Sequence, residues 1–252
     1  FDIHSDKGGK APEMQPGLPA GKPNPFKNFK VRKAVAHAIN IDEIIEFVME
    51  GSAYPASEII SKHVDGYNPN IKRAKFDPEL SKKLLAEAGF PNGFAFNFDC
   101  PNDRYINDQS VTEAIAHQLT KVGLKPTVVA QPKAVFFPKM NRYESPVFLA
   151  GWGTLSWQGT FNGFFKKKKG SVGRNNRGRY SNPEMEKRIN AANSEMDDAK
   201  RQALRGKVAA DIYATYFVIP LYYQENVYGF GNRVEGKARV DERVFAFDLK
   251  KK

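Results

Sequence analysis

A strand–helix–strand pattern between residues 94 and 130 constrains the fold of this chain more than any other feature. Residues 94–99 alternate phenylalanine with smaller or polar side chains, the period of two expected of a strand. An amphipathic helix follows and ends near Gly123, and residues 124–130 then predict a second strand. Two strands joined by such a helix lie parallel in one sheet, with a right-handed crossover. The pattern therefore predicts an α/β fold.

The rest of the chain continues this pattern. Residues 7–27 are rich in proline and glycine, which indicates a linker, and residues 153–181 are predicted to be irregular. Apolar periodicity and capping residues predict the remaining elements. Helices are expected at residues 28–39, 41–49, 78–88, 133–141, 183–195 and 198–214, and β-like runs at 147–152, 217–223, 227–230 and 244–247.

Size and composition place the chain among globular proteins. Its 252 residues fit one large or two small domains, and a 41% hydrophobic content supports a packed core. A single cysteine, Cys100, excludes an intrachain disulfide. No apolar run approaches the ~18 residues of a membrane span. The sequence opens at Phe1, without Met or a signal peptide, so we expect a processed or partial chain.

The positive charge is concentrated in one segment. Lys and Arg exceed Asp and Glu by 39 − 28 = 11, and residues 166–179 supply seven of the basic residues and no acid. Without that segment the balance of 11 − 7 = +4 is ordinary, so a nucleic-acid partner is not expected. Its phenylalanines precede the charges instead of interleaving with them. The segment fits either a solvated loop or a surface that attracts an anionic ligand or membrane headgroups.

No motif of a catalytic or metal site occurs. The sequence contains no GxSxG, HExxH, P-loop or GxGxxG pattern. The four histidines are scattered and have no metal-ligand spacing with the single cysteine. We therefore expect no enzyme activity, no metal and no cofactor.

Two loops at predicted strand ends are candidate ligand sites, because open α/β sheets place ligands there. The first, GWGTLSW, follows residues 147–150 and contains both tryptophans of the chain, although composition alone favours a core position for Trp152. The second, CPNDRYIND, offers Asn102, Arg104 and Tyr105 to a carboxylate or carbonyl. Its alternative is a simple capped turn before the next helix.

Five segments occur in the same order as in a known family. They are NPFKNFKVRKAVAHAINIDEII, DPELSKKLLAEAGFPNGF, LAGWGTLSW, YSNPEMEKRINAANSEMDDAKR and FVIPLYYQENVYG. Together they resemble the C-terminal half of the family 5 bacterial solute-binding proteins, the dipeptide, oligopeptide and nickel receptors of ABC importers. The resemblance implies a periplasmic-binding-protein-like lobe, with a mixed sheet, helices on both faces and a second lobe missing. Residues 28–223 would form the C-terminal lobe, with 1–27 a linker or crossover segment and 224–252 a crossover tail to the N-terminal lobe.

The resemblance also implies a function. The chain would be part of the substrate-binding component of an ABC importer, which binds a peptide or peptide-like small solute in a cleft between two lobes. The implied partners are this solute, which could be anionic, the ABC transporter permease and the missing N-terminal lobe. The implied location is the periplasm, or the outer side of the cytoplasmic membrane for a tethered form. A stand-alone truncated domain that acts through the basic loop on an acidic partner or a membrane surface remains an alternative.

The resemblance implies cleft-lining residues around the first tryptophan. The matching residues here are Trp152, Gly153, Thr154, Leu155 and Trp157. Peptide receptors of the family commonly carry an aspartate in this turn for the α-amino group of the ligand, but residues 145–183 contain no acid. Leu149 stands where oligopeptide receptors can carry a carboxylate-binding arginine. Arg142 is a nearby substitute, with an ordinary surface residue as its alternative.

Overall fold

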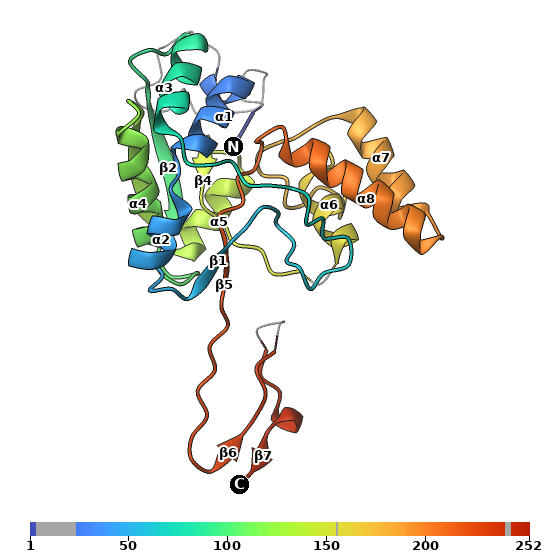
Figure 1. The fold of residues 1–252 in the computed structure, drawn as a ribbon. Helices are drawn as coiled ribbons and strands as arrows, with labels where there is room; N and C mark the ends of the chain where they lie inside the picture. The colour runs from blue at the N-terminus through green and yellow to red at the C-terminus, as the bar shows by residue number, and fades with distance from the viewer. Residues whose placement is uncertain (4–23, 155, 240–242) are drawn as a thin grey trace.

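Helices and strands alternate along most of the chain, as Figure 1 shows for a computed structural model. The structure describes residues 1–3, 24–154, 156–239 and 243–252. The helices are η1 (Pro25–Lys27), α1 (Phe29–Ala38), α2 (Ile41–Phe47), α3 (Pro78–Glu87), α4 (Asp108–Thr120), α5 (Lys133–Asn141), α6 (Trp157–Phe164), α7 (Pro183–Ser194), α8 (Asp198–Tyr213) and η2 (Ala246–Asp248). The strands are β1 (Ala53–Pro55), β2 (Ala95–Pro101), β3 (Lys125–Gln131), β4 (Val147–Phe148), β5 (Tyr222–Gln224), β6 (Val234–Glu235) and β7 (Lys250–Lys251).

The strand–helix–strand prediction is confirmed by a parallel sheet with strand order β3–β2–β4. Strand β2 pairs with β3 along its whole length, from Ala95 opposite Lys125 to Pro101 opposite Gln131. Its other edge pairs with β4 through Phe98 and Asp99. The antiparallel pairs, β1 with β5 and β6 with β7, form separate two-stranded sheets. The described chain therefore contains both parallel and antiparallel pairs, but they lie in separate sheets and not in one mixed sheet. The βα crossovers keep β2, β3 and β4 parallel.

Helices cover both faces of the parallel sheet, as predicted for an α/β fold (Figure 1). Phe96, Phe98 and Cys100 point to one face and share a buried core with residues of α1 and α4. Asp99 lies between them in sequence, so it points to the opposite face, where it forms an ion pair with Lys139 of α5. The side chain of Asp99 is completely buried.

A second core lies away from the sheet. It combines apolar side chains of α6, α7 and α8 with Ile60 and Val64 from the connection between β1 and α3. This connection leaves the sheet side, crosses to the helices and returns to α1, where the Asp77 amide donates to the His37 carbonyl over 2.8 Å. The long crossing segment is therefore part of the packing between the two cores.

Two side chains attach this crossing segment to the β1–β5 ribbon. Nη1 of Arg73 donates to the carbonyls of Ala56 (3.3 Å), Leu221 (3.2 Å) and Pro220. The Tyr223 hydroxyl donates to the carbonyls of Glu58 (2.9 Å) and Ile60 (2.7 Å). The ribbon is thereby fixed at the junction between the two cores.

Glu58 is a buried acid at this junction. One carboxylate oxygen accepts from the Asn68 amide over 2.7 Å, while the other has no hydrogen-bond partner among the described residues. Burial raises the pKa of Glu58 from 4.5 to about 7. The neighbouring Tyr213 and Tyr223 hydroxyls supply no positive charge that would stabilise the anion.

We expect Glu58→Gln to stabilise the protein in a pH-dependent way. The folded state binds the Glu58 proton more tightly than the unfolded state, so stability falls as the pH rises from 4.5 to about 7. A neutral amide avoids this loss, and we expect a gain of about 2–3 kcal/mol near pH 8 and almost none near pH 4. Urea unfolding at the two pH values measures the difference. An equal gain at both would contradict the assignment of the pKa to burial.

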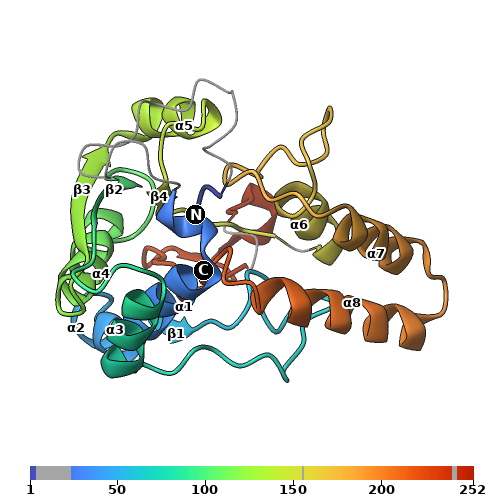
Figure 2. The ribbon, with the colours of Figure 1, turned by 90° about the horizontal axis from the view of Figure 1, so that it is seen from above.

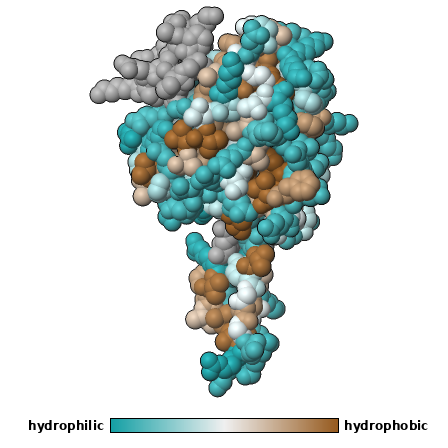
Figure 3. Space-filling model, turned by 90° about the vertical axis from the view of Figure 1, so that its left-hand side faces the viewer, coloured by the Kyte–Doolittle hydropathy of each residue, from teal (hydrophilic) through white to brown (hydrophobic). Residues whose placement is uncertain are grey.

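The two ends of the chain differ in how they pack against the body. Residues 1–27 were expected to form a linker or crossover segment, but Phe1–Ile3 pack against the body, because Asp2 is buried, its amide donates to the Pro146 carbonyl over 2.8 Å and its carboxylate pairs with Arg179. Residues 4–20 lie outside the described residues. At the other end, residues 225–239 and 243–252 lie below β5 (Figure 1), with apolar surface among them (Figure 3), and Phe247 is exposed.

Candidate functional site

The loops that follow β2 and β4 meet at the carboxyl edge of the parallel sheet. The Tyr105 hydroxyl, from the loop after β2, donates to the carbonyl of Gly151, after β4, over 3.2 Å. The Tyr105 ring lies so close to Gly151 that a Cβ atom there would be 2.7 Å from the ring. Glycine at this position is what lets the two loops approach each other, as expected where parallel strands end together.

The loop after β2 is shaped by Asp108. Its buried carboxylate accepts from the backbone amides of Arg104 (3.1 Å) and Tyr105 (3.0 Å). Asn107 has a left-handed backbone with φ of 53°, and its side-chain amide donates to the Val48 carbonyl over 2.7 Å. The Asn107 side chain makes no capping bond to α4, so Asp108 closes the turn that precedes the helix, and this turn leaves Asn102 and Arg104 exposed.

The charge left unpaired in this loop is positive. The Asp103 carboxylate accepts from the Lys133 amide over 2.6 Å, and Asp108 is occupied by the turn. Arg104 lies 5.0 Å from the centre of the Tyr105 ring and has no carboxylate partner among the described residues. A ligand at this edge therefore meets a guanidinium group and no uncommitted acid from this loop.

Trp152 is partly exposed beside this loop, as expected for a residue that faces a ligand. The residue is 39% exposed, and Nε1 donates to the Thr160 hydroxyl over 3.3 Å. Its ring meets the edge of Phe164 at a centroid distance of 5.0 Å. These contacts with α6 fix the indole in place and leave part of the residue exposed.

The residues after Trp152 form the turn into α6. Gly153 is exposed, and the Thr154 hydroxyl bonds the backbone of Ser156 at 3.1 Å. The Ser156 hydroxyl accepts from the Gly159 amide over 3.1 Å and caps α6. Leu155, also a predicted site residue, lies outside the described residues.

Trp157 and Arg142 do not join this group. Trp157 is 1% exposed and stacks on Phe161 in the second core, so its indole has no surface that a ligand of this lobe could contact. Arg142 is exposed and forms two bonds to Glu144, of 2.6 and 2.8 Å, which lower the pKa of that carboxyl. The structure thus favours the surface alternative for Arg142. Leu149 is buried in the first core.

Two features of this region were missed from the sequence. No sequence pattern indicated that Phe164 packs against the Trp152 ring as well as against the second core, whereas Phe165 is fully buried. The spacing of four residues between Thr160 and Phe164 was the available signal, because it places both side chains on the face of α6 where Thr160 bonds Trp152. Ile106, 49% exposed beside Tyr105, adds apolar surface that no pattern had indicated.

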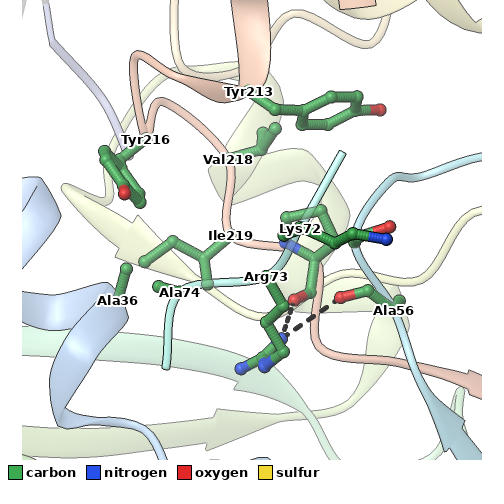
Figure 4. A pocket seen from close by; sticks show the side chains of 11 residues that line it. Ala36, Ala56, Lys72, Arg73, Ala74, Tyr213, Tyr216, Val218 and Ile219 are labelled. Atoms are coloured by element: carbon green, nitrogen blue, oxygen red, sulfur yellow. Dashed lines mark hydrogen bonds between the residues drawn. The ribbon is translucent and has the colours of Figure 1, made fainter. Parts of the chain in front are cut away.

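A small pocket lies elsewhere, at the junction between the two cores. It is lined by Ala36 of α1, by Lys72 and Arg73, and by the chain after α8 (Figure 4). Its lining includes none of the predicted site residues.

Comparison with known proteins identifies the family. Residues 13–171 match the family described as "Bacterial extracellular solute-binding proteins, family 5 Middle". The chain belongs to this family. It is 28% identical to heme-binding protein A of Haemophilus influenzae over 84% of its length, and 28% identical to the glutathione-binding protein GsiB of Pectobacterium atrosepticum over 89%. The resemblance predicted from the sequence is confirmed.

A solved structure shows the same fold. The periplasmic binding protein DppA of Helicobacter pylori, in complex with the peptide STSA, superposes with a TM-score of 0.77 at 23% identity, over 93% of this chain and 46% of that protein. The chain spans 39% and 45% of the two curated relatives. The fold is thus that of one lobe of a periplasmic binding protein.

Proposed function

We propose that this chain forms one lobe of the substrate-binding component of an ABC importer, which binds a small peptide-like solute. The solute would lie between the carboxyl edge of the sheet and a second, N-terminal lobe. The two curated relatives are named heme-binding and glutathione-binding proteins, and the similar solved structure contains a bound peptide. The protein would act with a permease, in the periplasm or tethered outside the cytoplasmic membrane, and not as an enzyme. Over the described ranges, no helix has the length and apolarity needed to cross a bilayer.

The contact between Tyr105 and Gly151 is the observation that carries this proposal. It joins two loops from different strands into one surface, with Trp152 on one side and Arg104 on the other. Binding surfaces of this kind use aromatic area for affinity and a few polar groups for orientation. The proposed surface also includes Asn102, Tyr105, Gly153 and Thr154. Leu155, which lies outside the described residues, is included on the basis of the sequence alone.

The path of the chain supports a second lobe on this side. Asn107 contacts the end of α2, and α2 leads directly to β1. The β1–β5 ribbon and the tail that follows it lie below the same end of the sheet (Figure 1). Residues 28–223 would therefore be the body of the lobe, to which Phe1–Ile3 and Phe26 also belong by their packing, and 224–252 a segment that crosses to its partner.

The charges favour a solute with a carboxylate or another anionic group over one recognised by a free amine. A buried ammonium group without a carboxylate is costly, and the acids of the loop after β2 are already used by the protein. Calorimetry on the protein purified from its source, with a tripeptide and its N-acetylated form, tests this. We expect the two forms to bind alike and salt to weaken both. Loss of binding on acetylation would contradict the proposed solute class.

The same calorimetry tests the surface itself. A methyl group at position 151 would displace the Tyr105 ring, so Gly151→Ala is expected to weaken binding about tenfold, which corresponds to about 1.4 kcal/mol. Gly229→Ala is the matched control, because a Cβ atom at position 229 meets nothing within 4 Å and the residue lies outside the proposed surface. Equal affinities of the two variants would show that the contact between the loops does not shape the site.

A further inference from the structure

The structure divides the basic segment 166–179 into two sets. Lys166 is buried and its ammonium group bonds the side chain of Asn190. Arg177 bonds Asn141 over 3.0 Å and lies over the Phe137 ring, and Arg179 pairs with Asp2. These three cations are part of the packing. The expectation of a wholly solvated loop is therefore wrong for them.

The other four cations point to solvent. Lys167, Lys168, Lys169 and Arg174 are exposed, and none has a carboxylate partner within salt-bridge distance among the described residues. We call residues 167–174 the basic turn. Glu186 reaches it only through the backbone amide of Lys167, over 2.9 Å. The four side-chain charges are therefore available to an external anion.

The backbone of the basic turn is ordered by its own contacts. Lys169 and Val172 exchange two backbone hydrogen bonds of 3.0 and 3.1 Å, which close the turn around Gly170 and Ser171. The Gly173 amide donates to Asn162 over 2.9 Å, and the Asn176 side chain bonds the carbonyls of Lys166 and Tyr180. Like charges held close together in this way repel one another, so the arrangement favours a site for anions.

We propose that the basic turn binds anionic phospholipid headgroups at a membrane surface. Lysine suits a phosphate as a compact charge, and a lipid surface requires no matching groove. The chain between α6 and α7 loops outward from the body, which lets it reach a flat surface (Figure 2).

The surroundings of the turn argue against other polyanions. Phe161 and Phe165 are buried, and Phe164 packs on Trp152, so no aromatic ring of this segment is placed to stack on a nucleic-acid base. Within the described part of residues 157–195, no large apolar side chain is exposed. A specific protein interface needs an apolar centre, whereas headgroups are attracted by charge alone.

Co-sedimentation with vesicles tests the proposal on the protein purified from its source, without solute. We expect binding to phosphatidylcholine vesicles that contain phosphatidylglycerol and little binding to phosphatidylcholine alone. Replacing Lys167, Lys168 and Lys169 with Gln should weaken binding by about fivefold per lysine, roughly 100-fold in total. Added salt should also weaken it, because the Debye length falls from about 10 Å at 0.1 M to about 3 Å at 1 M.

Replacing Lys250, Lys251 and Lys252 with Gln provides the matched control, since it removes the same charge from another exposed segment. This control should bind the anionic vesicles nearly as well as the unchanged protein. Equal losses in both triple variants would overturn the proposal, as would equal binding to both kinds of vesicle. A single-stranded oligonucleotide that binds more tightly than the anionic vesicles would assign the turn to nucleic acid instead. Because no solute is involved, these outcomes do not depend on the proposed transport function.

Discussion

Replacing Lys139 with Met is expected to lower the free energy of unfolding by about 3–5 kcal/mol. Lys139 pairs with Asp99, whose side chain is completely buried on the α5 side of the sheet. The second oxygen of Asp99 has no hydrogen-bond partner among the described residues, so the ammonium group is its main compensation. Without it a carboxylate is left buried and uncompensated at the centre of β2. Urea unfolding measures the change.

Lys133→Met is the matched control, because Lys133 lies on the same helix and its ammonium group is 3.9 Å from the exposed carboxylate of Asp103. An exposed pair of this kind is worth less than about 1 kcal/mol. Adding Asp99→Asn to Lys139→Met should recover much of the loss, since it removes the buried charge. Equal destabilisation by Lys133→Met and Lys139→Met would show that burial does not govern this ion pair.

The fold was predictable where local sequence determines it. The alternation of phenylalanines from residue 94 predicted β2, and the glycine at 123 correctly ended the helical segment before β3. The Asp99–Lys139 pair was not predictable, because it joins residues 40 positions apart through the packing of α5. The crossing segment was likewise missed, since Ile60 and Val64 find their partners in helices that follow much later in the chain.

The candidate site was likewise predictable only in part. That the loops after β2 and β4 lie at one edge follows from parallel strands, and the sequence predicted Tyr105 and Trp152 there. The sequence did not predict the directions in which the two tryptophan side chains point. Trp152 and Trp157 are five positions apart in one motif, but the capped start of α6 turns one outward and the other into the core. Only the contacts of α6 with α7 and α8 decide this.

The two tryptophans are therefore expected to have opposite roles. Trp157→Ala should lower the free energy of unfolding by about 3–5 kcal/mol, because it empties a buried site. Its ring stacks on Phe161 of the same helix at 4.0 Å, lies under Arg205 and fills the space beside Gly66, so α8 and the crossing segment both lose contact with α6. Trp152→Ala should cost less than about 2 kcal/mol of stability, since its ring is partly exposed. It should instead weaken solute binding by about 2 kcal/mol, or roughly 30-fold.

Fluorescence of the single-tryptophan variants separates these roles without relying on stability alone. In Trp152→Phe only Trp157 emits, and its buried indole should give blue-shifted emission that does not respond to solute. In Trp157→Phe only Trp152 emits, and we expect red-shifted emission that shifts to the blue when solute covers the ring. Phenylalanine keeps most of the apolar volume, so both variants should fold. A solute response from Trp157 with none from Trp152 would contradict the proposed surface, because the indole that the fold leaves exposed would then not be the one that contacts the ligand.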